Sequence, residues 1–309
     1  MMGGSGGGSY TGRSSEDLVN VVRTEGEKAA GQFEVEVAQF LSGLLARSGK
    51  DTDLVRERLD EAKDALSEET ESSFDTLFGG SVAKRTYVDG LSDIDALLVI
   101  NGSMFGDKTP SKILDRMQAI LREKLPKEIA VDHGRMAVTV KYPDGMEIQL
   151  LPAIREETVT KVPSARHAGW SHIEPDGFRQ ALSRHNELCG GKLVPTIKLA
   201  KAVIANMPEQ YRLSGYHVES LAIAAFKKYD GKKTTETMLP LFFEKAKNLV
   251  LAPIRDSTGQ SVHVDGYLGG ENSELRQNIG HLLGNIAKRM RNASIGKSLA
   301  QWGSLFNNE

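Results

Sequence analysis

The sequence has 309 residues and a single cysteine, Cys189. One thiol cannot close a disulfide within the chain, and it cannot supply a zinc site built from thiolates. Disulfide-stabilised and thiolate-zinc folds are therefore excluded, and a reducing cytoplasm is the expected location. The plain interpretation of Cys189 is a small, buried apolar residue.

Long apolar runs and an excess of either charge are also missing. No apolar run approaches the roughly 20 residues that a bilayer-spanning helix needs, so no membrane contact is expected. The chain carries 39 basic and 41 acidic residues, which gives a net charge of −2. Proteins dedicated to long nucleic-acid duplexes usually show a basic excess. Small anionic substrates therefore fit this composition better than a long polymer.

The apolar pattern divides the chain into three parts. Residues 1–13 are rich in glycine and serine and predict a flexible tail. Residues 14–165 predict a lobe of mixed helices and strands that starts with a long helix over 14–48. Residues 166–309 predict a mostly helical lobe that binds substrate. We therefore expect a bilobal α+β protein with a mixed β-sheet, and a ligand-binding cleft between its lobes.

Shorter segments can be assigned by their periodicity and their turn residues. An apolar run over 95–100 indicates a buried strand, and 137–141 with 146–151 indicates a hairpin around Pro143-Asp144-Gly145. Residues 155–178, with their prolines and glycines, predict a polar connector. Helical spacing predicts further helices over 52–66, 112–125, 178–188, 192–206, 216–228, 235–250 and 272–293.

Two carboxylates, Asp93 and Asp95, stand directly before the apolar residues Ala96 to Ile100. Alternate side chains of a strand share a face, so these carboxylates would lie about 6–7 Å apart on one side. Such a pair repels itself unless a cation lies between its members. Magnesium prefers carboxylate oxygens, and two ions about 3.5–4 Å apart suit an in-line phosphoryl displacement. The pattern therefore predicts a site for two magnesium ions.

A phosphate-binding turn is predicted about a dozen residues earlier, at Gly79-Gly80-Ser81. Glycine lets the backbone approach a phosphate closely, and the Ser81 hydroxyl can add a hydrogen bond. The segment from Ser81 to Thr86 is expected to open a helix, whose free N–H groups suit an anion. Either motif alone is common on solvated surfaces and in helix caps. Their conjunction with the buried strand favours a nucleotide site at Gly80, Ser81, Asp93 and Asp95.

These residues resemble the nucleotidyltransferase signature of the polymerase-beta superfamily. The resemblance is closest to its second-messenger branch, which includes oligoadenylate synthase, cyclic GMP-AMP synthase and the bacterial cyclases of CBASS anti-phage systems. It extends from about Val55 to Met290. It implies a magnesium-dependent enzyme that makes a cyclic di- or trinucleotide from ATP and other ribonucleoside triphosphates. The implied partners are an effector protein that binds the product, and a regulatory protein or a weak nucleic-acid activator.

The resemblance also assigns residues in the helical lobe. Lys198 and Lys201 lie three apart on one helix face, and they resemble the basic residues that the family places on the donor triphosphate. A solvated helix face is the plain alternative. The segment Ser214–Glu219 is similar to the family's Ser-x-Tyr-His segment, which implies that Tyr216 stacks on a base. Gly215 stands where the family has a phosphate-contacting serine, and Ser214 lies one residue earlier. The segment from Asp256 to Leu268 also looks like the bacterial cyclases.

One departure concerns the third carboxylate of the family pattern. The family places this acid three residues before the proline of a Leu-Pro-Ala-like ending, and here Gln149 occupies that position before Pro152. An amide is a poor magnesium ligand and cannot act as a base. Glu147 would share a strand face with Gln149. We therefore expect Glu147 to be the third ligand or the base for the 3′-hydroxyl, with an exposed strand residue as the alternative.

Two other functions stay open. The acceptor can instead be an RNA 3′ end, a small molecule such as an antibiotic, or a protein side chain. Gln149 also keeps open a catalytically weak sensor that binds nucleotide without turning it over. A P-loop enzyme and an HExxH zinc protease are excluded, because neither motif occurs in the sequence.

Overall fold

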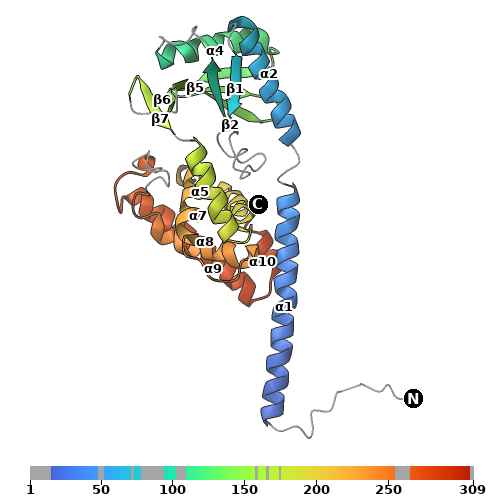
Figure 1. Cartoon of the computed structure of the whole chain (residues 1–309). Helices are drawn as coiled ribbons and strands as arrows, with labels where there is room; N and C mark the ends of the chain where they lie inside the picture. Colours follow the sequence, from blue (N-terminus) through green and yellow to red (C-terminus); the bar gives the residue numbers. More distant parts are fainter. Residues whose placement is uncertain are drawn as a thin grey trace, which may run out of the picture.

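The structure is a computed structural model that describes residues 15–47, 52–70, 73–77, 94–101, 109–156, 159–164, 167–173, 175–254 and 265–306. A β-sheet with two covering helices forms one part of the molecule, and a bundle of helices forms the other (Figure 1). The long helix α1 (Ser15–Arg47) runs beside the bundle. The predicted α+β class is therefore confirmed.

The sheet is mixed, as expected. Its path is β1-β2-β5-β4-β3, and β6 and β7 extend it from β5. β2 (Ile94–Asn101) is antiparallel to β1 (Ser73–Leu77) and parallel to β5 (Glu147–Glu156). β5 then pairs with β4 (Val138–Lys141), which pairs with β3 (Ala130–His133). The predicted hairpin is the β4–β5 pair, and the predicted buried strand is β2.

The prediction of a polar connector over 155–178 is wrong. This segment contains the end of β5, then β6 (Val159–Pro163) and β7 (Trp170–Ile173), and the start of α5 (Pro175–Leu188). Thr160 and Val162 of β6 are buried at 4% and 3% exposure, so a period of two is present. The polar and proline residues around it hide this period in the sequence. β6 is stabilised mainly by pairing with the end of β5, which composition does not signal.

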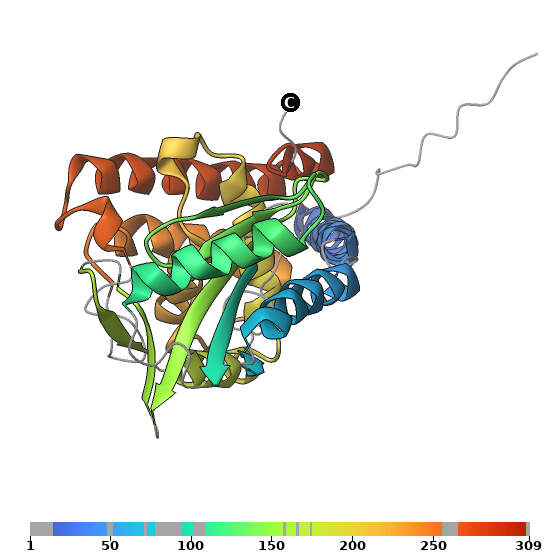
Figure 2. The same ribbon diagram turned by 90° about the horizontal axis from the view of Figure 1, so that it is seen from above.

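Two helices cover one face of the sheet. α2 (Thr52–Thr70) and α4 (Pro110–Lys124) lie side by side across the strands (Figure 2). Proline is favourable in the first turn of a helix, which explains where α4 begins. Its apolar face joins the inward side chains of the strands in one core, which includes Leu98, Ile113, Met117, Val140, Ile148 and Leu150. The opposite face of the sheet carries a smaller cluster of Leu97, Val99, Ala153 and Val162.

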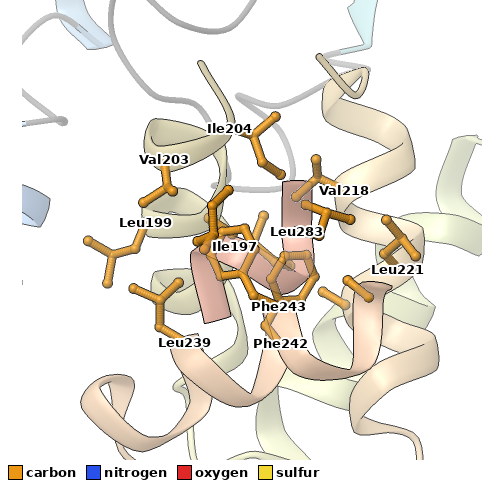
Figure 3. Close-up of a cluster of buried hydrophobic side chains, with 14 of the residues drawn as sticks. Ile197, Leu199, Val203, Ile204, Val218, Leu221, Leu239, Phe242, Phe243 and Leu283 are labelled. Atoms are coloured by element: carbon orange, nitrogen blue, oxygen red, sulfur yellow. The ribbon is translucent and has the colours of Figure 1, made fainter. Parts of the chain in front are cut away.

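The second part of the molecule is built from helices. Those close to predicted ones are α5, α6 (Leu193–Ala205), α7 (Gly215–Phe226), α8 (Thr235–Leu249) and α9 (Glu274–Ile295). The short helices η1 (Glu209–Tyr211), η2 (Gly266–Leu268) and α10 (Leu299–Gly303) were not predicted. Their shared core surrounds Phe242 and Phe243 of α8 (Figure 3). None of the described helices is both long enough and apolar enough to cross a membrane.

Helix α1 packs on the helical part of the molecule. Phe33, Val37 and Leu41 are buried in the helical core, and α1 contacts α6, α8 and α10. The boundary between the two lobes at residue 165 stays a prediction. Residues 1–13, the predicted flexible tail, lie outside the described residues.

Candidate active site

Part of the predicted site lies outside the described residues. This holds for Gly80, Ser81 and Asp93 and for the predicted helix over 81–86. Asp95 is described through its backbone, which lies in β2. The metal and phosphate roles given to these residues therefore stay predictions, and the geometry below concerns their neighbours.

The strand register places Asp95 beside Gln149. Their Cα atoms are partners in the parallel β2–β5 pair, and Gln149 is also the partner of Thr139 on β4. Ile148 and Leu150 face the core beneath α2 and α4. Because side chains alternate along a strand, Gln149 and Glu147 belong to the opposite face. The Gln149 amide is thus on the strand next to Asp95, with Glu147 two residues away along β5.

Glu147 is available to a cation. Its Oε1 lies 3.9 Å from Nζ of Lys141, and their side chains are 43% and 45% exposed. An ion pair at this distance between two exposed side chains contributes little free energy. The Glu147 carboxylate can therefore leave Lys141 and bind a cation instead. Carboxylate oxygens are the donor type that magnesium prefers; Asp95 and Glu147 can supply them, whereas the Gln149 amide is a poor substitute. Within the described ranges no three metal-ligating side chains cluster.

The two lysines of α6 have different environments. Lys198 is half-buried and has no acidic partner in the part of the chain that the structure describes. Burial lowers the pKa of the Lys198 ammonium, and the positive charge of Lys201 lowers it further. Lys201 is buried, and its Nζ lies 2.9 Å from Oε1 of Glu219 on α7, with 5% and 1% of the two side chains exposed. An anion that approached Lys198 would relieve an uncompensated positive charge.

Gly215 explains how Lys201 reaches the start of α7. A Cβ atom built on Gly215 would lie 3.2 Å from Nζ of Lys201, closer than most side-chain contacts. Glycine therefore leaves room for the ammonium beneath the first turn of α7. A serine at this position, as in the family pattern, would require the Lys201 side chain to shift.

Ser214 determines where α7 begins. Its Oγ accepts a hydrogen bond of 3.3 Å from the backbone N–H of His217, which is the usual role of an N-cap serine. The Ser214 backbone N–H donates to the hydroxyl of Tyr267 over 3.1 Å. Tyr216 is half-buried and packs against the helical core. The phosphate role of Ser214 and the stacking role of Tyr216 stay predictions.

A buried polar network lies beneath this turn, and sequence reasoning missed it. His217, Asp265 and Arg276 are each 0% exposed. Arg276 Nη1 donates to Asp265 Oδ2 over 2.7 Å, and the guanidinium also donates to the carbonyl oxygens of Val250 and Gly269. The network joins α7 to the first turn of α9.

His217 is neutral within this network. Burial lowers its pKa to about 4, and the charge of Arg276 lowers it too, while Asp265 opposes both. Its Nδ1 lies 3.0 Å from the hydroxyl of Tyr267. Its Nε2 lies 3.6 Å from Asp265 Oδ2, too far for a hydrogen bond, and has no other partner in the described part of the chain.

A cavity of about 430 Å³ lies in another region, between the end of α6, α9 and the residues after α10. Its lining includes Asn206, Met207, Asn285, Arg289 and Leu305, and none of the predicted site residues. The candidate site is therefore defined by register and polar contacts.

Comparisons with known proteins identify the fold. Residues 34–186 match the Second Messenger Oligonucleotide or Dinucleotide Synthetase domain. Curated protein sequences gave no match. Among solved structures, CdnC of E. coli MS115-1 with ATP is similar, with a TM-score of 0.67 and 16% identity over 88% of this chain and 98% of that chain. CdnC is also known in a complex with HORMA-deltaN.

Two further structures show the same likeness. CdnE cyclic dinucleotide synthase of Elizabethkingia meningoseptica, with GTP and Apcpp, gives a TM-score of 0.62 and 13% identity over 81% of this chain and 98% of that chain. DncV cyclic AMP-GMP synthase of Vibrio cholerae, with nonhydrolyzable GTP, gives a TM-score of 0.59 and 11% identity over 96% of this chain and 92% of that chain. At these identities the likeness shows a shared fold. The match over 34–186 shows that this part of the chain is a Second Messenger Oligonucleotide or Dinucleotide Synthetase domain, and it makes the protein an enzyme of the nucleotidyltransferase class.

Proposed function

We propose that this enzyme joins ribonucleoside triphosphates, ATP among them, into a cyclic di- or trinucleotide in anti-phage CBASS signalling. The observation that carries the proposal is the β2–β5 register, which brings Asp95 next to Gln149 and close to Glu147 on the neighbouring strand. Glu147 would thereby add a carboxylate from a second strand to that of Asp95, which suits a metal-dependent phosphoryl transfer.

The residues take separate roles in this proposal. Asp93, Asp95 and Glu147 would hold two magnesium ions, which when bound supply positive charge for the attacking and leaving oxygens. Gly80 and Ser81 would cradle the donor triphosphate, and Ser214 would support it from the helical lobe. Lys198, with Lys201 behind it, would bind the same triphosphate from α6. Tyr216 would stack on a base.

The proposed reaction balances in each cycle. A ribose hydroxyl of one nucleotide attacks the α-phosphorus of another, so one phosphorus–oxygen bond forms while the bond to pyrophosphate breaks. The hydroxyl proton passes to a carboxylate, for which Glu147 is the candidate. Pyrophosphate leaves, and the same chemistry repeats until the ring closes, in two cycles for a dinucleotide and three for a trinucleotide.

Incubating the full chain with labelled nucleoside triphosphates and magnesium, without another acceptor, tests this function. A small product that resists phosphatase, with a mass equal to a cyclic oligonucleotide, supports it. Label transferred to RNA, a small molecule or protein would favour another acceptor. Nucleotide binding without release of pyrophosphate would favour the catalytically weak sensor that Gln149 keeps open.

The third carboxylate can be located by two substitutions on β5. Glu147→Gln is expected to lower the product rate about 10²-fold or more, because it removes a charged ligand or a general base. Gln149→Glu is expected to raise the rate, because it restores an acid beside Asp95. Initial rates of pyrophosphate release measure both effects. If Glu147→Gln has no effect while Gln149→Glu raises the rate, the third-ligand role of Glu147 is wrong.

The charge of Lys198 predicts a pH effect on nucleotide affinity. Its ammonium has a pKa below the ordinary value of 10.5, so it loses its charge at lower pH than an exposed lysine. The KM for ATP should therefore rise as pH approaches that lowered pKa from below. Lys198→Arg should remove this rise, because arginine stays protonated. Lys192→Arg, at an exposed lysine before the same helix, should leave the profile unchanged.

We also propose two partners and a location. An effector protein would bind the cyclic product. The CdnC complex with HORMA-deltaN supports a regulatory protein partner, with a weak nucleic-acid activator as the alternative. The expected location is the cytoplasm.

A further inference from the structure

Tyr267 of η2 is an exposed aromatic residue with a fixed position. It is 51% exposed, and it is the one aromatic residue among the exposed large hydrophobic residues of the described part of the chain. Exposed apolar surface is common, but it usually belongs to side chains that are free to move. Tyr267 is held by its hydroxyl, so its exposed surface belongs to an immobilised ring.

Two hydrogen bonds hold the hydroxyl. It accepts from the backbone N–H of Ser214 over 3.1 Å, and it lies 3.0 Å from Nδ1 of His217. The phenol can donate its proton to Nδ1, since His217 is neutral, which places the imidazole proton on Nε2. Burial of the hydroxyl raises the pKa of Tyr267, so the phenol keeps its proton. Asp265 lies 3.6 Å from the other ring nitrogen, Nε2, and is itself paired with Arg276.

The ring is also constrained by its neighbour. The rings of Tyr267 and His217 meet edge to face, with centroids 6.0 Å apart and an angle of 84°. Aromatic pairs prefer this arrangement. The orientation of the Tyr267 ring is therefore determined by buried groups, although the ring itself meets solvent.

This ring stands at the start of α7, next to the residues of the candidate site. The Tyr267 hydroxyl accepts its hydrogen bond from the backbone N–H of Ser214, which is followed in the chain by Gly215 and Tyr216. Gly215 in turn approaches Nζ of Lys201. The charge of Lys201 is paired with Glu219, whereas Lys198, one turn earlier on α6, is half-buried and has no acidic partner among the described residues. The exposed ring of Tyr267 therefore lies on the turn that packs against the helix carrying Lys198. A nucleotide offers the matching chemistry, since it has an anionic phosphate chain and a flat base.

We propose that Tyr267 forms a second aromatic surface that stacks on a nucleobase of a bound ribonucleotide. The proposal rests on the proposed function, which places nucleotides at this turn. Every base has a π face, so the contact adds affinity for any base and favours the larger purines. The competing role for Tyr267 is that of a clamp whose hydroxyl alone matters.

Two substitutions separate stacking from clamping. Tyr267→Phe keeps the ring and removes the hydroxyl, whereas Tyr267→Leu removes both the ring and the hydroxyl. Titration of the full chain with ATP and magnesium should give a Kd within about twofold of wild type for the Phe variant. The Leu variant should bind ATP about tenfold more weakly, the size of a single base-stacking contact. Inorganic tripolyphosphate, which has no base, should bind all three proteins equally.

Ile295→Ala, which truncates another exposed apolar residue, is the matched control and should bind ATP like wild type. Equal losses in the Phe and Leu variants would show a clamp and overturn the proposal. An unchanged Kd in the Leu variant, or an equal loss of tripolyphosphate binding, would also overturn it.

The same proteins distinguish this inference from the proposed function. If wild type makes no cyclic product but the ATP titrations follow the expected pattern, the proposed function fails and the base contact stands. If wild type makes the product and the Leu variant binds ATP normally, the base contact alone fails. If wild type binds no ATP, both are wrong.

Discussion

Asp95→Asn is expected to lower the rate of product formation about 10³-fold. A bound metal contributes several kcal/mol of charge stabilisation, and each 1.36 kcal/mol corresponds to a factor of ten. Asparagine keeps the size of aspartate but removes the charge that attracts the cation. Steady-state pyrophosphate release, compared with wild type at saturating magnesium, measures the effect.

The fold of this variant should be intact. Asp95 pairs with Gln149 through backbone hydrogen bonds of the β2–β5 ladder, which the substitution leaves in place. Without magnesium the variant should be at least as stable as wild type, because two neighbouring carboxylates repel each other. Asp132→Asn is the matched control, since this exposed acid lies on β3 and pairs with Arg122 over 3.3 Å. A rate within tenfold of wild type for Asp95→Asn would contradict the metal role.

Arg276→Leu is expected to reduce the free energy of unfolding by about 3–5 kcal/mol. Its guanidinium and the Asp265 carboxylate are both 0% exposed, and the substitution leaves that carboxylate buried without its cationic partner. The carbonyl oxygens of Val250 and Gly269 also lose their donors. The melting temperature should fall by roughly 6–20 °C, at about 2–4 °C for each kcal/mol.

A double substitution tests whether the unpaired carboxylate causes this loss. Arg276→Leu with Asp265→Leu should be less destabilised than Arg276→Leu alone, because no buried charge remains. Arg289→Leu, at an exposed arginine of the same helix, should change the free energy of unfolding by less than about 1 kcal/mol. Additive effects of the two substitutions at 265 and 276 would show that the pair is not coupled.

Local patterns predicted the elements that carry strong local signals. The apolar residues of α4 recur at helical spacing, so the predicted limits, 112–125, were close to those observed. The buried strand β2 and the β4–β5 hairpin were predicted for similar reasons. Strands β6 and β7 were missed, because β6 depends on pairing with residues 154–156 of β5 and β7 depends on pairing with β6, and their composition does not signal either.

Contacts between elements could not be predicted in this way. Lys198 and Lys201 share a helix face and looked equivalent, yet α7 supplies Glu219 to Lys201 alone. The pairing of Asp265 with Arg276 depends on how η2 meets α9, and so does the neutral state of His217. Family resemblance assigned Ser214 and Tyr216 to the nucleotide, but it said nothing of the hydroxyl that holds this turn.

A crystal structure of the full chain with a non-hydrolysable ATP analogue and Mn²⁺ would show where the metal binds. We expect anomalous peaks for the metal within bonding distance of the carboxylates at 93 and 95, with the triphosphate seated against residues 79–81. Metal bound elsewhere, or the 93 and 95 carboxylates turned away from the nucleotide, would contradict this expectation.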